Sequence, residues 1–176
     1  MRAMRVPPGD EVVLRRAGPA DRPVMARLWQ LYLHDLSEFR GLMPGADGRY
    51  PEHRMVAFFT DPDRAAHLVR VGDAPAGFVL VRGLQGTARV MGEFFVVRAA
   101  RRRGVGHVAA RAALAGFPGP WEIPFQEANA GAARFWRRVA TVTVGEEWHE
   151  EARPVPGRPE LEPDVWLSLV APGSAR

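Results

Sequence analysis

The stretch between residues 88 and 126 constrains the fold more than any other part of this chain. It is predicted as a strand (ARVMGEFFVVR), an arginine-rich turn, a helix from Gly104 to Phe117 and a second strand (WEIPFQ). Two strands that are joined by a crossover helix lie parallel in one sheet, and such connections are right-handed. The sequence therefore predicts a right-handed βαβ unit with parallel strands.

The other elements complete a single domain. Periodicity and turn residues predict, in chain order, a strand at 11–17, a helix at 24–39 with Asp21 as its cap, strands at 67–71 and 77–83 joined as a hairpin, a helix at 130–139 capped by Asn129, and strands at 141–151 and 164–170. Residues 53–60 are ambiguous, with a short helix as one interpretation. Pro124 predicts incomplete pairing on one side of its strand. The order indicates an α+β domain at 11–171, with tails at 1–10 and 172–176.

Composition narrows the classes of function. The 176 residues include no lysine and no cysteine, and the 24 basic residues are all arginine, against 20 acidic residues. This balance favours a bias in base composition over a nucleic-acid partner. The lack of cysteine excludes disulfides and thiolate metal sites. The first residues lack the apolar segment of a signal peptide, and no apolar run is long enough to span a membrane, so we expect a cytoplasmic protein with no membrane partner.

The turn between the parallel strands has the features of a phosphate cradle. Gly104 and Gly106 lack a β-carbon, so an anion can approach the backbone N–H groups at the start of the helix. Arginines at 101–103 add charged donors. A P-loop is excluded because it needs lysine, and a dinucleotide motif fits poorly because Ala109 stands at its third glycine. The alternative is an ordinary solvated turn.

Two motifs together resemble the GNAT family of N-acetyltransferases. The segment Arg101-Arg102-Arg103-Gly104-Val105-Gly106 matches the family pattern [Q/R]-x-x-G-x-[G/A], and the segment from Asn129 to Trp136 (NAGAARFW) matches N-x-x-A-x-x-[FL]-[YFW]. The resemblance covers about residues 11 to 170. It implies a mixed, largely antiparallel sheet with splayed middle strands around the βαβ unit and with helices on both faces.

The resemblance also implies a donor, an acceptor and binding residues. The donor would be acetyl-CoA, or another acyl-CoA, and the acceptor would be a primary amine, expected to be a small molecule. Homodimers are common in this family, so the resemblance also makes a homodimer possible. The backbone near Phe94 and Val96 would pair with the pantetheine, and the Val96 amide would polarise the thioester carbonyl. The residues implied at the pyrophosphate and along the donor are Arg101, Arg102, Arg103, Gly104, Val105, Gly106, Asn129 and Trp136.

The catalytic residues are less well marked. Glu93, on the strand that leads to the turn, is the candidate base, with Glu122 and Glu127 as weaker ones. Trp136 stands where many family members have a tyrosine as general acid, and indole cannot supply that proton. Water, Tyr32 or Tyr50 would then donate it, or the protein is a silent acyl-CoA-binding domain.

Two further groups of polar residues have open roles. His107 is expected to be a surface or packing residue rather than a catalytic one. His34, Asp35 and Glu38 gather near the end of the first helix, where they form either an acidic wall for a cationic acceptor or a solvated face. No metal site is predicted, because His34 and Glu38 lack a further histidine nearby in the sequence.

Overall fold

A computed structural model describes residues 11–173 of the chain. The elements are β1 (Val12–Arg16), α1 (Arg22–Arg40), α2 (His53–Thr60), β2 (Arg64–Val71), β3 (Ala74–Arg82), β4 (Arg89–Val96), α3 (Val105–Gly116), β5 (Gly119–Phe125), α4 (Ala130–Val144), β6 (Trp148–Arg153) and β7 (Asp164–Ala171). The strands form one sheet in the order β1-β2-β3-β4-β5-β7-β6. Only β4 and β5 pair in parallel among the described strands, which confirms the predicted fold class and its βαβ unit.

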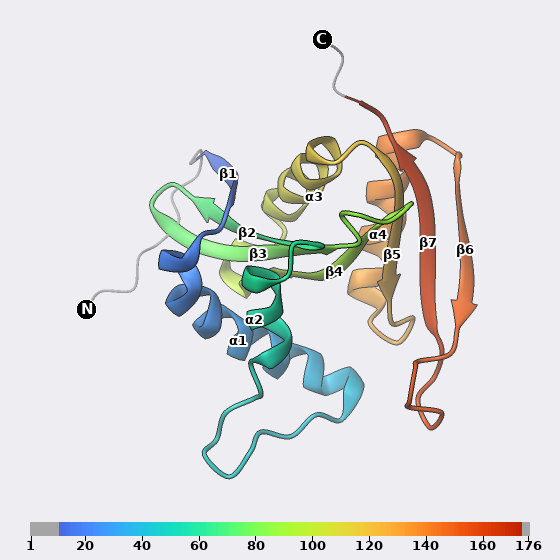
Figure 1. Cartoon of the computed structure of the whole chain (residues 1–176). Helices are drawn as coiled ribbons and strands as arrows, with labels where there is room; N and C mark the ends of the chain where they lie inside the picture. The colour runs from blue at the N-terminus through green and yellow to red at the C-terminus, as the bar shows by residue number, and fades with distance from the viewer. Residues whose placement is uncertain (1–10, 174–176) are drawn as a thin grey trace.

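The helices cover the sheet on both faces (Figure 1). One apolar cluster joins α1 and α2 to β2, β3 and β4, with Trp29 and Phe78 at its centre. A second cluster, on the opposite face, joins α3 and α4 to the sheet and includes Trp121 and Trp136. Residues of β4 alternate between the two, with Phe95 in the first cluster and Val96 in the second. This alternation decides which face each polar residue of β4 can reach.

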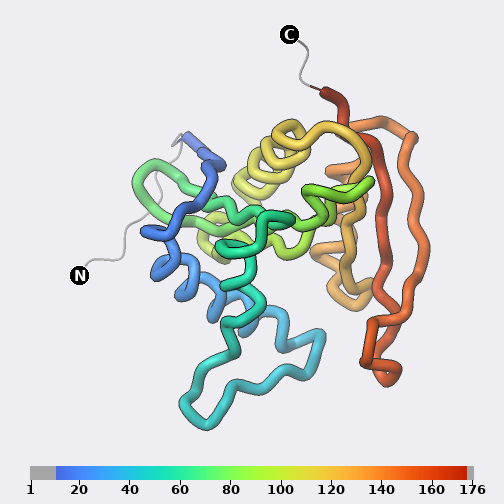
Figure 2. Tube along the Cα trace, in the orientation of Figure 1, coloured from blue at the N-terminus to red at the C-terminus, as the bar shows by residue number. Residues whose placement is uncertain are grey.

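The two parallel strands separate soon after they meet. β4 and β5 pair only at Arg89 with Trp121 and at Val90 with Glu122, whereas β5 pairs with β7 along its whole length. The backbone of β4 from residue 91 to 96 therefore has no strand partner on the β5 side. Pro124 lies in the part of β5 that has lost β4, which confirms the predicted one-sided pairing. Figure 2 follows the chain through this separation.

The predicted strand at 141–151 is wrong in its first half. Residues 141–144 (TVTV) continue α4 to Val144, and the strand begins only at Trp148. Val139 and Ala140 are buried on the helix face that packs on the sheet, and the Thr143 hydroxyl donates to the carbonyl of Val139 at 2.7 Å. Burial of the preceding turn thus outweighs the weak helix propensity of β-branched residues. Gly145, at φ 65°, then ends the helix.

The remaining elements lie within a few residues of their predicted bounds, and the ambiguous segment at 53–60 is the helix α2. The predicted tail at 1–10 and residues 174–176 lie outside the described residues, so the domain bounds stay a prediction. No helix in the described range has the length and apolar character needed to cross a membrane.

Candidate functional site

The turn before α3 has a backbone that suits an anion. Arg102 has φ 59°, the only positive φ of a described residue other than glycine, and Gly104 has φ 79°. The first hydrogen bond of α3 runs from the Val108 N–H to the Gly104 carbonyl, so the N–H groups at 105–107 have no acceptor within the helix. Left-handed residues alternating in a turn aim successive N–H groups at one point, and such concave turns bind phosphate.

The two glycines serve different purposes. A β-carbon on Gly104 would meet no atom within 4 Å, so this residue keeps space open at the turn. A β-carbon on Gly106 would lie 3.2 Å from Cε2 of Phe135 on α4. Gly106 therefore lets α3 approach α4 closely, in addition to the role in phosphate approach that the sequence predicts for it.

The arginines of the turn also have different surroundings. The Arg101 side chain donates to the Val96 carbonyl at 2.7 Å and pairs with Asp35 of α1. Arg98 donates to the same carboxylate at 2.8 Å. Burial works against the charge of Asp35, but these hydrogen bonds outweigh it and lower its pKa. Arg101 thus fastens the turn to α1, and the exposed Arg102 extends over the groove.

A groove of about 710 Å³ runs from this turn between α1, β4 and α4. It brings together most of the predicted donor-binding residues, and its lining includes Phe94, Val96, Arg101, Arg102, Gly104, Gly106, Asn129 and Trp136. Arg103 and Val105 are outside the lining, and Val105 is buried in the core beneath the turn. The groove also reaches Tyr32 on α1.

Aromatic rings form the wall of the groove on the α4 side. Phe94 stacks on Phe135 at 5.4 Å between ring centroids and meets the edge of Trp136 at 5.0 Å. Asn129 caps α4, since its side-chain oxygen accepts from the Ala132 N–H at 3.1 Å. Trp136 is thus a buried wall residue, as its apolar ring suggests, and Asn129 lies at the entrance of the helix beside the groove.

Glu93 lies at the centre of a hydrogen-bonded group that joins three elements. Its side chain accepts hydrogen bonds from the Tyr32 hydroxyl on α1 and from the Arg54 guanidinium on α2. Glu93 is only 7% exposed, and burial raises its pKa although Arg54 and Tyr32 act in the opposite direction. Burial and the charge of Glu93 raise the pKa of Tyr32 well above its ordinary value. The sequence marked Glu93 and Tyr32 separately, and nothing in it marked Arg54.

The other polar candidates are held in different surroundings. Glu122 accepts from Arg153 at 2.8 Å, and Glu127 pairs with Arg137 at 2.7 Å. The Tyr50 hydroxyl makes no hydrogen bond to a described residue. His34 is largely exposed, with 75% of its side chain accessible. Across residues 11–173, no three His, Asp or Glu side chains gather as a metal site would need.

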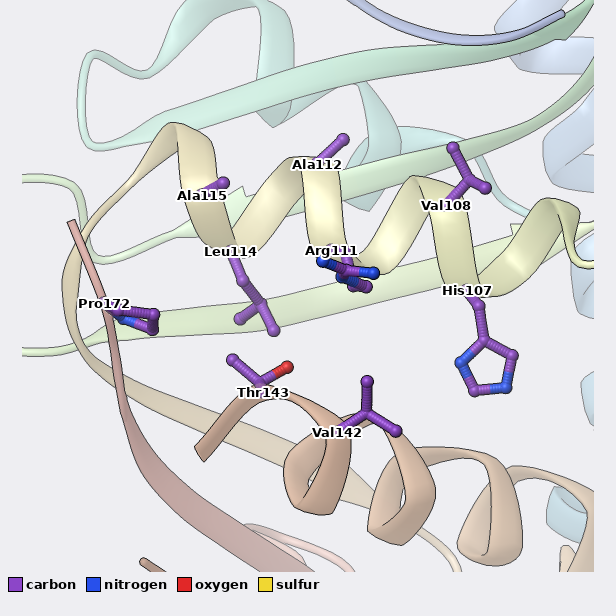
Figure 3. A pocket seen from close by; sticks show the side chains of 9 residues that line it. All are labelled: His107, Val108, Arg111, Ala112, Leu114, Ala115, Val142, Thr143 and Pro172. Carbon is purple, nitrogen blue, oxygen red and sulfur yellow. The ribbon is translucent and has the colours of Figure 1, made fainter. Parts of the chain in front are cut away.

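A second hollow, of about 460 Å³, lies between α3 and α4 (Figure 3). His107 stands at one end of it, next to the groove described above, and points toward α4 (Figure 3). Burial, with the charge of Arg138, lowers the pKa of His107, which favours the neutral ring. The ring lies 5.0 Å from that of Phe135, so His107 packs between the two helices as predicted for a packing residue.

Known structures share this fold. A crystal structure of an acetyltransferase from Thermus thermophilus is similar with a TM-score of 0.67 and 17% identity over 95% of this chain and 99% of that one. A spermidine N-acetyltransferase from Vibrio cholerae, in complex with CoA and spermine, has a TM-score of 0.67 at 11% identity, over 91% of this chain and 95% of that one. An aminoglycoside acetyltransferase in complex with coenzyme A has a TM-score of 0.64 at 13% identity, with the same coverage.

Sequence comparison identifies the family. No curated protein matches the chain at a significant level. The sequence pattern of the acetyltransferase (GNAT) family, however, matches residues 26–140, a range that runs from α1 through the turn and α3 into α4. This range holds the turn, the groove and the Glu93 group. The chain therefore belongs to the acetyltransferase (GNAT) family.

Proposed function

We propose that this protein is an N-acetyltransferase that transfers the acetyl group of acetyl-CoA to the primary amine of a small molecule. The observation that carries the proposal is that one groove runs from the anion-binding turn to Tyr32, whose hydroxyl donates to the buried carboxylate of Glu93. The N–H groups at 105–107 and Arg102 lie at one end of it, and Tyr32, bonded to Glu93, lies at the other.

The donor side fits a CoA thioester. The turn offers backbone donors and a positive helix end to the pyrophosphate. The unpaired edge of β4 at 91–96 offers backbone groups to the amides of pantetheine, although the Val96 carbonyl already accepts from Arg101. Phe94 and Trp136 line the apolar part of the groove. When bound, acetyl-CoA supplies the thioester carbonyl that an amine attacks.

The chemistry then falls to the Glu93 group. Glu93 accepts the proton that the amine loses as the new C–N bond forms. Tyr32 donates its hydroxyl proton to sulfur as the C–S bond breaks, and it regains a proton from Glu93 through their hydrogen bond. The raised pKa of Tyr32 keeps this hydroxyl protonated until then. Tyr32 thereby takes the role for which Trp136 has no suitable group.

Thermal unfolding with and without ligands tests the donor site. Saturating acetyl-CoA or CoA should raise the unfolding temperature, because ligand that binds only the native state stabilises it, whereas ATP should act weakly. Gly104→Val places a side chain in the open space of the turn and should abolish the shift. Gly41→Val is the matched control, because Gly41 also has positive φ and open surroundings but ends α1. An unchanged shift in Gly104→Val contradicts the donor site.

A further inference from the structure

Two arginines lie side by side on the sheet, beyond Glu93 as seen from the donor turn. Arg64 and Arg82 are neighbours on β2 and β3, and the register continues from Arg82 through Val90 of β4 to Glu122 of β5. Leu80, which lies opposite Glu93, belongs to the α1–α2 face, so Glu93 and Arg82 share that face as neighbours on either side of a register shift between Leu80 and Val81.

The other arginines that lie near Glu93, Arg82 or Glu122 have an acidic partner. Arg54 donates to Glu93, and Arg64 pairs with Asp61 at 3.0 Å while lying over the ring of Phe58. Arg153 pairs with Glu122 and with Glu151. Arg40, at the end of α1, pairs with Asp164. Their charges are therefore matched within the protein.

Arg82 is the exception. It is half-buried, and no hydrogen bond or ion pair joins it to another residue in the described part of the chain. Burial and the nearby charges of Arg64 and Arg54 lower its pKa, while the charges of Glu93 and Glu122 act in the opposite direction. None of the Arg82 nitrogens is both buried and unbonded, so its guanidinium reaches solvent and can bind an anion from there. The five donors of a guanidinium fit a carboxylate or a phosphate.

Arg54 and Arg82 are the two cations whose charges act on Glu93. Glu93 is nearly covered, but Arg54 above it has 63% of its side chain exposed, which makes this the open side of the carboxylate. Asp35 does not offer a free negative charge to a cationic acceptor, because it pairs with Arg98 and Arg101. An amine that reaches Glu93 on this side has Arg82 and Arg54 as its nearest cations.

We infer that the acceptor is a small amine that also carries an anionic group, carboxylate or phosphate, which binds Arg82 while the amine lies at Glu93. The inference rests on the proposed acetyl transfer and adds the chemical class of its acceptor. Glu93 and Arg82 lie on neighbouring strands, so one small molecule can contact both side chains. Polyamines, which have no anion, would leave Arg82 unmatched.

Matched amines test the inference. CoA release from acetyl-CoA is measured with phenylalanine and phenylalaninamide, with 4-aminobutyrate and butylamine, and with phosphoethanolamine and ethanolamine. In at least one pair, the kcat/KM of the anionic amine should be at least about tenfold higher than that of its neutral partner. The first two pairs test a carboxylate and the third tests a phosphate. Arg82→Gln should remove this preference, whereas Arg70→Gln, near the end of β2 with its side chain on Asp73 of the β2–β3 turn, should keep it.

Each result has a distinct meaning. Equal or better turnover of the neutral members, or a preference that survives in Arg82→Gln, overturns the inference and leaves acetyl transfer standing. No turnover of any of these six amines overturns the inference alone, because acetyl transfer to a polyamine or an aminoglycoside would still stand. The unfolding temperature of Arg82→Gln gives a second measure, since loss of an unpaired charge should leave stability unchanged or raised. A marked loss of stability would show that Arg82 is a structural residue, which also overturns the inference.

Discussion

The hydroxyl of Tyr32 on α1 donates a hydrogen bond to the carboxylate of Glu93 on β4. The two residues are far apart in the sequence, and the contact joins the helix that closes the groove to the strand that carries the free backbone edge. It brings a phenol and a carboxylate to the same point, in a family member that has Trp136 where many members have a tyrosine.

Replacing Tyr32 tests its role as proton donor. Tyr32→Phe keeps the ring between Trp29 and Phe78 but removes the hydroxyl, so kcat should fall about 10²–10⁴-fold with little change in the KM for acetyl-CoA. Tyr50→Phe is the control, because its hydroxyl has no partner among the described residues. Equal kcat in the wild type and Tyr32→Phe would exclude Tyr32 as the acid.

The pH dependence of the rate tests Glu93. As a base it acts only when deprotonated, and burial raises its pKa above the ordinary 4.5. The rate should therefore fall as the pH is lowered through this raised value, with the midpoint above 4.5. Glu93→Gln should lose about 10²–10⁴-fold in kcat together with this acidic limb of the profile. Glu127→Gln, which removes one partner of an exposed ion pair, should keep the acidic limb. An acidic limb that survives in Glu93→Gln would contradict the assignment of Glu93 as the base.

Asp21 gives a prediction about stability. Hydrogen bonds from Arg15 and from the Gly18 N–H lower the pKa of Asp21 to about 2 from 3.8. Because the folded pKa is the lower one, the ion pair stabilises the fold above pH 3.8 and loses this effect as the pH falls toward 2. Asp21→Asn should thus cost about 1 kcal/mol at pH 7, since the Arg15 end is solvent-exposed, and the difference should shrink as the pH falls toward 2.

Chemical denaturation at the two pH values measures this difference. Asp73→Asn serves as the control, because the Asp73 side chain is 97% exposed. A stability loss that does not shrink at the acidic pH would contradict the ion-pair explanation.

The sequence predicted Asp21 correctly at the start of α1, but its hydrogen bonds differ from those of a helix cap. Its carboxylate accepts from Arg15 and Gly18 rather than from the first turn of α1.

The sequence predicted what depends on neighbours along the chain. Gly104 and Asn129 stand at helix starts, and the apolar spacing of α3 decides its face, so the turn, the cap and the βαβ unit could be inferred from local rules. The match of two spaced motifs then extended this local result to the whole fold.

Contacts between distant segments could not be inferred in this way. The partner of Arg101 is Asp35 and the partner of Glu93 is Arg54, and each pair joins segments whose meeting depends on tertiary packing. The continuation of α4 through TVTV has the same cause, because burial against the sheet overrides the strand propensity of Val142 and its neighbours. Long-range packing thus settled what local pattern left open.

The most direct measurement is acetyl transfer itself. Purified protein is incubated with acetyl-CoA and, in separate reactions, with a polyamine, an aminoglycoside, amino acids and a peptide amine, while CoA release and the acetylated amine are followed by absorbance and mass spectrometry. We expect CoA release that requires an amine, equals the acetylated product and is lost in Glu93→Gln. Acetyl-CoA binding with no acetylated amine in any reaction would instead identify a catalytically silent acyl-CoA-binding protein and contradict the proposed function.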